Sequence, residues 1–86
     1  MKIKFPIIGW EDYKSWQFED KSMLKRINGL IKDIQRTPYE GKGKPESLKY
    51  DLSGFWARRI DREHRLVYRI EENELYILSC KYYYDK

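Results

Sequence analysis

The sequence has few of the residues that bind metals or form cross-links. Cys80 is the one cysteine and His64 the one histidine among 86 residues. A single cysteine excludes an intrachain disulfide, and no Cys/His cluster has the spacing of a metal site. No apolar run approaches the roughly 20 residues of a membrane span, and the first residues lack the long apolar region of a secretory signal. We therefore expect a cytoplasmic protein with no metal, cofactor or membrane association.

Charge and aromatic side chains are plentiful, and the positive charge is concentrated in one segment. Residues 41–69 contain eight Lys/Arg and four Asp/Glu, a balance of +4 that equals the net charge of the whole chain. The flanks cancel, with +2 over residues 1–40 and −2 over residues 70–86. Cations mixed with aromatic residues suit a polyanion-binding surface. One carboxylate in the segment, Glu46, is a candidate general base.

Hydrophobic periodicity predicts a single α+β domain over residues 1–86 with the order βααββββ. A short strand over 2–8 ends at Gly9, and a helix follows over 10–19. A second helix, capped by Asp20 and stopped by Pro38, has one apolar stripe. A Gly- and Pro-rich loop over 37–46 leads to four strands in a mainly antiparallel sheet, which the helices cover on one face. These strands are predicted at 47–51, 55–60, 64–71 and 74–83.

The alternation of side chains along the strands predicts two different faces. If Ile60 pairs with His64, Arg59 lies opposite Arg65, and Ile70 pairs with Leu75 at the next turn. The more apolar face should lie under the helices; it contains Trp56, Arg58, Ile60, His64, Leu66, Tyr68 and Ile70. The other face should be open, and it contains Phe55, Ala57, Arg59, Arg65, Val67 and Arg69, joined by Tyr76, Leu78, Cys80 and Tyr82. Two facing arginines destabilise a sheet, so this pair indicates an anion site.

Each candidate residue also has a structural interpretation. Lys42, Lys44 and Lys49 could contact phosphates or keep a loop soluble. Glu46 could be a surface acid paired with a lysine, and His64 is expected to have a structural role on the core face. The tyrosines at 82–84 suit sheet packing, base stacking or phenol chemistry.

Several segments together resemble the YoeB family of bacterial toxin ribonucleases, within the RelE-like superfamily. They are Trp16-Gln17, RTPYEGKGKPESLKYDLSGFWARRI and REHRLVYRI with the aromatic tail. The resemblance covers essentially the whole chain. It implies a compact fold with two helices on a curved antiparallel sheet, and metal-independent cleavage of messenger RNA in the A site of the 70S ribosome. It also implies control by a YefM-like antitoxin, and a homodimer is possible.

The resemblance implies a role for each site residue. Glu46 corresponds to the general base, Arg65 to the transition-state stabiliser, and Tyr84 to the C-terminal aromatic residue. The expected RNA-binding cations are Lys42, Lys44, Lys49, Arg58 and Arg59. Where these toxins usually have a histidine acid, this chain has Tyr83; a phenol, with an ordinary pKa of about 10 against about 6.5 for imidazole, is a poorer proton donor near neutrality.

Two other functions share the same cations. One is an RNA- or ribosome-binding protein that blocks translation without catalysis. The other is a basic protein whose surface mainly binds an acidic antitoxin.

Overall fold

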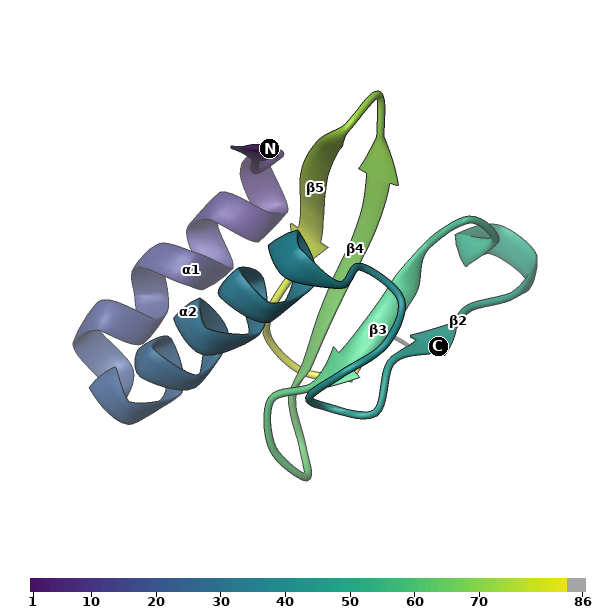
Figure 1. The fold of residues 1–86 in the computed structure, drawn as a ribbon. Coiled ribbons are helices and arrows are strands. Elements are labelled where there is room, and N and C mark those ends of the chain that lie inside the picture. Colours follow the sequence, from purple (N-terminus) through teal and green to yellow (C-terminus); the bar gives the residue numbers. More distant parts are fainter. Residues whose placement is uncertain (84–86) are drawn as a thin grey trace.

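The computed structural model describes residues 1–83 and contains two helices packed beside one sheet (Figure 1). The helices are α1 (Ile7–Glu19) and α2 (Lys21–Arg36), and a short 3₁₀ helix, η1, spans Tyr50–Leu52. The strands are β1 (Lys2–Lys4), β2 (Glu46–Ser47), β3 (Trp56–Arg59), β4 (Arg65–Glu71) and β5 (Glu74–Ser79). Within the described residues, no helix is long and apolar enough to cross a bilayer.

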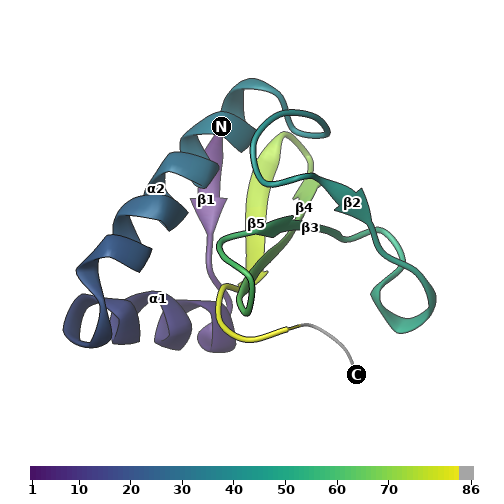
Figure 2. The ribbon, with the colours of Figure 1, turned by 90° about the horizontal axis from the view of Figure 1, so that it is seen from below.

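The five strands form one sheet in the order β1-β5-β4-β3-β2, and both helices lie on the same side of it (Figure 2). The pairs from β2 to β5 are antiparallel, and β1 is parallel to β5. The predicted α+β class and the two helices on one face of a mainly antiparallel sheet are confirmed. Arg59 is paired with Arg65 and Ile70 with Leu75, as the alternation predicted.

The main core lies between α2 and the helix-facing side of the sheet. Ile27 and Ile34 from the predicted stripe of α2 are completely buried, as are Leu66, Tyr68 and Ile77 from the sheet. The helix begins where predicted, because the Asp20 carboxylate accepts a hydrogen bond from the Ser22 N–H (3.0 Å). It ends at Arg36, just before Pro38.

The prediction that Gly9 separates the first strand from the first helix is wrong. The strand ends at Lys4, Pro6 is the N-cap, and Gly9 lies inside α1. The glycine is needed for packing, because a Cβ at this position would collide with the backbone carbonyl oxygen of Ile77 in β5. It lets α1 lie directly against the sheet.

The second face of the sheet is less open than predicted. The predicted strand over 47–51 is reduced to Glu46–Ser47, and the chain then turns into η1. Leu48, Leu52 and Phe55 from this segment pack over Ala57 and Val67, which are 2% and 1% exposed. The segment after β2 therefore forms a small second core on this face.

A β-bulge in the last hairpin changes the predicted register. Tyr68 pairs with Ile77, whereas Val67 pairs with Ser79, so one extra residue is inserted in β5. Cys80 therefore lies in the main core rather than on the arginine face. Burial, reinforced by the nearby Asp12 carboxylate, raises the pKa of its thiol to about 12. This cysteine is structural.

Candidate functional site

Sheet register places the candidate base and two arginines on the face opposite the helices. Glu46 pairs with Ala57, and Ala57 with Val67, so these residues form one row across three strands. Arg59 and Arg65 form the next row on the same face, two residues further along. Strand spacing places the Glu46 Cα ~8 Å from that of Arg59 and ~12 Å from that of Arg65. Long side chains at these spacings can converge on one phosphate.

Arg65 is fixed by the turn between β3 and β4. Its Nη1 donates to the carbonyl oxygens of Asp61 (2.8 Å), Arg62 (3.3 Å) and His64 (3.1 Å). The residue is 8% exposed. Its guanidinium carbon lies 4.5 Å from the centre of the Tyr83 ring, a distance typical of a cation–π contact. The structure thus brings one catalytic candidate into contact with another.

The segment before Tyr83 is attached to His64 and Arg65. The Tyr82 N–H donates to His64 Nδ1 (2.7 Å), and the Tyr82 carbonyl accepts from the Arg65 N–H (3.1 Å). His64 itself is buried against the edge of the Trp16 ring, which confirms that it faces the core. After the bulge, Tyr82 lies against His64 instead of joining the arginine face. Tyr84 lies outside the described residues.

Arg58 has a structural position, and its predicted contact with RNA is contradicted by its burial. The side chain is 0% exposed, and its Nη1 lies 2.6 Å from Asp33 Oδ2. Its two terminal nitrogens also donate to loop carbonyls, at Thr37 (2.7 Å), Glu40 (3.0 Å) and Lys42 (3.0 Å). Arg58 therefore holds the loop that leads to Glu46.

Asp33, which lies on α2, holds the same loop together with Arg58. It accepts from the Lys42 N–H (2.9 Å) as well as from Arg58. These two hydrogen bonds lower the pKa of the Asp33 carboxyl below its ordinary value. Gly41 (φ 120°) is required beside it, because a Cβ there would collide with the Asp33 carboxylate. Gly41 thus lets the loop pack directly on the ion pair.

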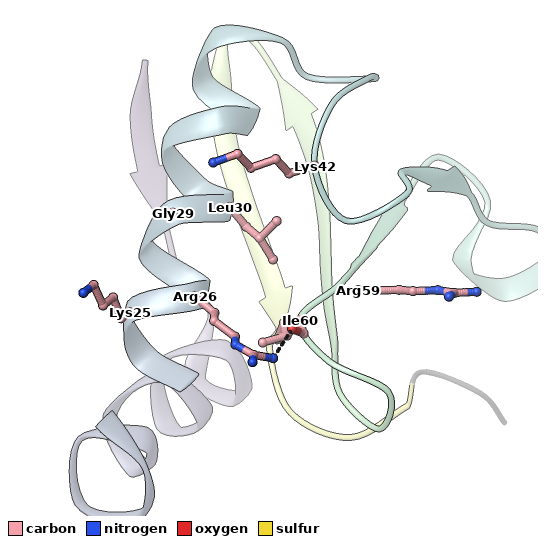
Figure 3. Close-up of a pocket in the computed structure, with 7 residues that line it drawn as sticks. All are labelled: Lys25, Arg26, Gly29, Leu30, Lys42, Arg59 and Ile60. Carbon is pink, nitrogen blue, oxygen red and sulfur yellow. Dashed lines mark hydrogen bonds between the residues drawn. The ribbon is translucent and has the colours of Figure 1, made fainter. Parts of the chain in front are cut away.

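The remaining predicted cations are not all on the arginine face. Lys42 lines a cleft of about 330 Å³ on the helix side of the sheet, with Lys25 and Arg26 of α2. Arg59 also lines this cleft, but Figure 3 shows its side chain pointing away from α2, whereas the Lys42 side chain points toward α2. Lys44 is exposed in the loop, and Lys49 is exposed at the start of η1. Of these predicted cations, Arg59 is the one that strand register places beside Arg65 on the sheet face of Glu46.

Sequence reasoning missed the pair that holds the loop. Asp33 interrupts the apolar stripe of α2 beside Ile34, and a charged residue at such a position needs a buried partner. Arg58 falls on the helix-facing side of its strand by parity, so the two signals together could have identified the ion pair. The contact of Tyr82 with His64 could not have been found, because it depends on the bulge.

The geometry defines a class of protein: a small α+β domain that places a carboxylate, Glu46, on the same sheet face as Arg59 and Arg65. Comparisons with known proteins agree. The family model described as "YoeB-like toxin of bacterial type II toxin-antitoxin system" matches residues 5–84. Toxin YoeB of Escherichia coli (strain K12) is 56% identical over 84 residues, covering 98% of this chain and 100% of that protein.

Solved structures of relatives have the same fold. A YoeB/ParE toxin from Agrobacterium tumefaciens is 44% identical, with a TM-score of 0.95 over 98% of this chain and 100% of the relative. A Staphylococcus aureus relative, 50% identical with 98% of both chains covered, was solved as a heterotetrameric YoeB-YefM complex (TM-score 0.90) and as a YoeB dimer (0.91). The chain belongs to the YoeB family of type II toxins.

Proposed function

We propose that this toxin is a ribosome-dependent endoribonuclease that cleaves messenger RNA in the A site. The observation that carries the proposal is the placement of Glu46 on the same sheet face as Arg59 and Arg65, with Tyr83 in contact with Arg65. A base, an oxyanion-stabilising pair and a proton donor are the groups that phosphodiester cleavage by a neighbouring hydroxyl needs. No metal is required in the proposed reaction.

Each residue has a defined role in the proposed reaction. The Glu46 carboxylate removes the proton of a ribose 2′-OH, whose oxygen then bonds to the adjacent phosphorus. Arg65, Arg59 and Lys49 stabilise the negative charge on the phosphorane oxygens. Tyr83 gives its phenol proton to the 5′-oxygen as the P–O5′ bond breaks. The products are a 2′,3′-cyclic phosphate and a 5′-OH end, and DNA is inert because it lacks the 2′-OH.

We further propose that a YefM-like antitoxin neutralises the toxin by covering this face. The support is the YoeB-YefM complex of the Staphylococcus aureus relative and the +4 balance of residues 41–69. Association with an acidic partner should be fast and salt-sensitive, since fields are screened beyond about 8 Å at physiological ionic strength. Self-association, as in the YoeB dimer of that relative, is testable by the dependence of mass on concentration.

The alternative is a toxin that occupies the ribosome without cutting. It is favoured by one observation, a tyrosine at position 83 where these toxins usually have histidine. Primer extension on translated messenger RNA after induction separates the two functions. A nuclease produces new 5′ ends inside codons, and those ends carry a hydroxyl. A blocking protein stops ribosomes on full-length messenger RNA, and that result would refute the proposed nuclease.

A further inference from the structure

Three side chains form a compact cluster on the same sheet face but away from the two arginines of the site. The guanidinium carbon of Arg69 lies 4.9 Å from the centre of the Phe55 ring and 4.6 Å from that of Tyr76. The ring centres are 6.3 Å apart. Register explains the arrangement: Arg69 pairs directly with Tyr76, and Phe55 directly precedes β3 on the other side. The Arg69 guanidinium therefore contacts both the Phe55 and the Tyr76 ring.

The cluster is close to the proposed reaction. Along β4, Arg65 and Arg69 lie on opposite sides of Val67, which belongs to the row of Glu46. Strand geometry separates the Arg65 and Arg69 Cα atoms by ~13 Å. Arg69 is likewise ~12 Å from Glu46 by the same spacing. An RNA strand held at the phosphate by Arg59 and Arg65 can therefore bring a neighbouring base over Arg69.

The hydrogen-bonding state of Arg69 favours stacking over phosphate binding. Its Nη2 already pairs with the Glu71 carboxylate (3.0 Å), which offsets part of its charge. Its Nε is buried and has no hydrogen-bond partner among the described residues. A buried N–H without an acceptor lowers stability, and the contacts of the guanidinium with two rings offset part of this cost. The side chain is 35% exposed, so part of it remains accessible while its guanidinium packs on the two rings.

We propose that Arg69, supported by Phe55 and Tyr76, is a stacking platform for a nucleobase beside the scissile phosphate. The proposal rests on the proposed function, because it takes the RNA strand as the ligand. Bases stack on guanidinium planes and aromatic rings in single-stranded RNA complexes. Stacking tolerates any base, since every base has a π-face. The platform therefore adds affinity and orientation with little sequence selectivity.

The test uses a short RNA whose scissile nucleotide is 2′-deoxy, so that it cannot be cut. In one probe 2-aminopurine directly precedes this nucleotide, and in a second probe it directly follows it. Stacking quenches 2-aminopurine fluorescence. The parent should quench one probe, and Arg69→Gln should remove the quenching and weaken binding roughly tenfold, within the range for one stacked base. Lys32→Gln removes one charge from the exposed face of α2 and should leave the quenching intact.

Two further variants separate stacking from charge and from folding. Arg69→Lys keeps the charge and should still lose the quenching, whereas Tyr76→Phe keeps the ring and should retain it. Quenching by Arg69→Lys equal to that of the parent would overturn the proposal. So would parent binding to both probes with neither quenched, or no binding at all. An antitoxin affinity that falls in Arg69→Gln while quenching persists would assign the cluster to a protein partner instead.

The assay needs no cleavage, so its outcome is independent of the proposed nuclease. A parent that quenches the probe but never cuts messenger RNA would refute the chemistry and retain the platform. A parent protein that cuts messenger RNA but quenches neither probe would retain the chemistry and refute the platform.

Discussion

The loop before Glu46 is attached by the buried Arg58–Asp33 pair, whereas the tail before Tyr83 is attached by the backbone of Tyr82 and by the Lys81 side chain, which pairs with Glu19 near the surface. Arg58 and Asp33 make their contacts to the loop while 0% and 7% exposed. Tyr82 is 61% exposed, and it keeps a left-handed backbone (φ 63°) through bonds to His64 and Arg65. A left-handed tyrosine is strained, so this end depends on those bonds.

The difference indicates which end of the site tolerates change. A general base must be held close to the proton it removes, and small misplacements slow such reactions greatly. Tyr83, the proposed proton donor, lies on the tail, whose last described residues are exposed. We infer that chemistry at position 83 can vary while the support of Glu46 cannot.

The largest effect should come from Arg58→Ala. Removing one partner of a buried ion pair costs about 3–5 kcal/mol. The Asp33 carboxylate then keeps only the exposed Arg36 as a cationic partner. In a domain of this size that lowers the melting temperature by at least ~12 °C. Arg59→Ala is the matched control, since the neighbouring side chain is exposed and should cost under ~1 kcal/mol. Equal losses in calorimetry would disprove the role assigned to Arg58.

Tyr83→Phe should have the next largest effect, on rate rather than stability. It keeps the ring over Arg65 and removes the proton, so single-turnover cleavage should fall roughly 10²-fold, as for other proton donors. Ribosome binding should change little, and Tyr83→His should restore or increase the rate. If Tyr83→Phe cleaves at the parent rate and Tyr84→Phe does not, the acid is Tyr84.

Lowering the pH should reduce the stability of the protein, because it protonates Asp33, which holds the loop before Glu46. The pKa of this carboxyl is lowered in the folded protein, first by the Lys42 N–H and then by Arg58. Its contribution to stability is therefore complete above the unfolded pKa of about 4 and is lost as pH falls through the lower folded value. Urea unfolding at several pH values should show parent and Asp33→Asn converging below about pH 4. A constant difference down to pH 2 would contradict this.

The smallest effect should come from removing the hydrogen bond between the Tyr82 N–H and His64. His64→Leu retains an apolar group against Trp16 but removes the acceptor for the Tyr82 N–H. Loss of one hydrogen bond, about 1 kcal/mol, should slow cleavage roughly fivefold through misplacement of Tyr83. The paired variant His64→Leu/Tyr83→Phe separates this from a general loss of packing. Its rate should equal that of Tyr83→Phe alone, and a further fivefold loss would argue against positioning.

Local rules predicted the elements and much of the site. The stripe of α2, its Asp20 cap and its stop before Pro38 depend on neighbouring residues, so they can be read in the sequence. The Arg59–Arg65 pair follows from one short turn, and the register was therefore correct.

The errors arose where distant segments meet. Gly9 lies inside α1 where the helix packs closely on β5, and Cys80 changes face because of the bulge in the pairing of β4 with β5. Arg58 was assigned to RNA by motif although parity placed it on the core face. The burial of its side chain depends on Asp33, which is 25 residues away in the chain.

The most direct test compares Glu46→Gln with Glu40→Gln in single-turnover cleavage on programmed ribosomes. Both variants replace an exposed glutamate of the same segment with its neutral isostere. The account predicts a fall of roughly 10²–10⁴-fold for Glu46→Gln, the range for a lost general base, and no change for Glu40→Gln. Cleavage by Glu46→Gln at the parent rate, with both proteins folded, would contradict it.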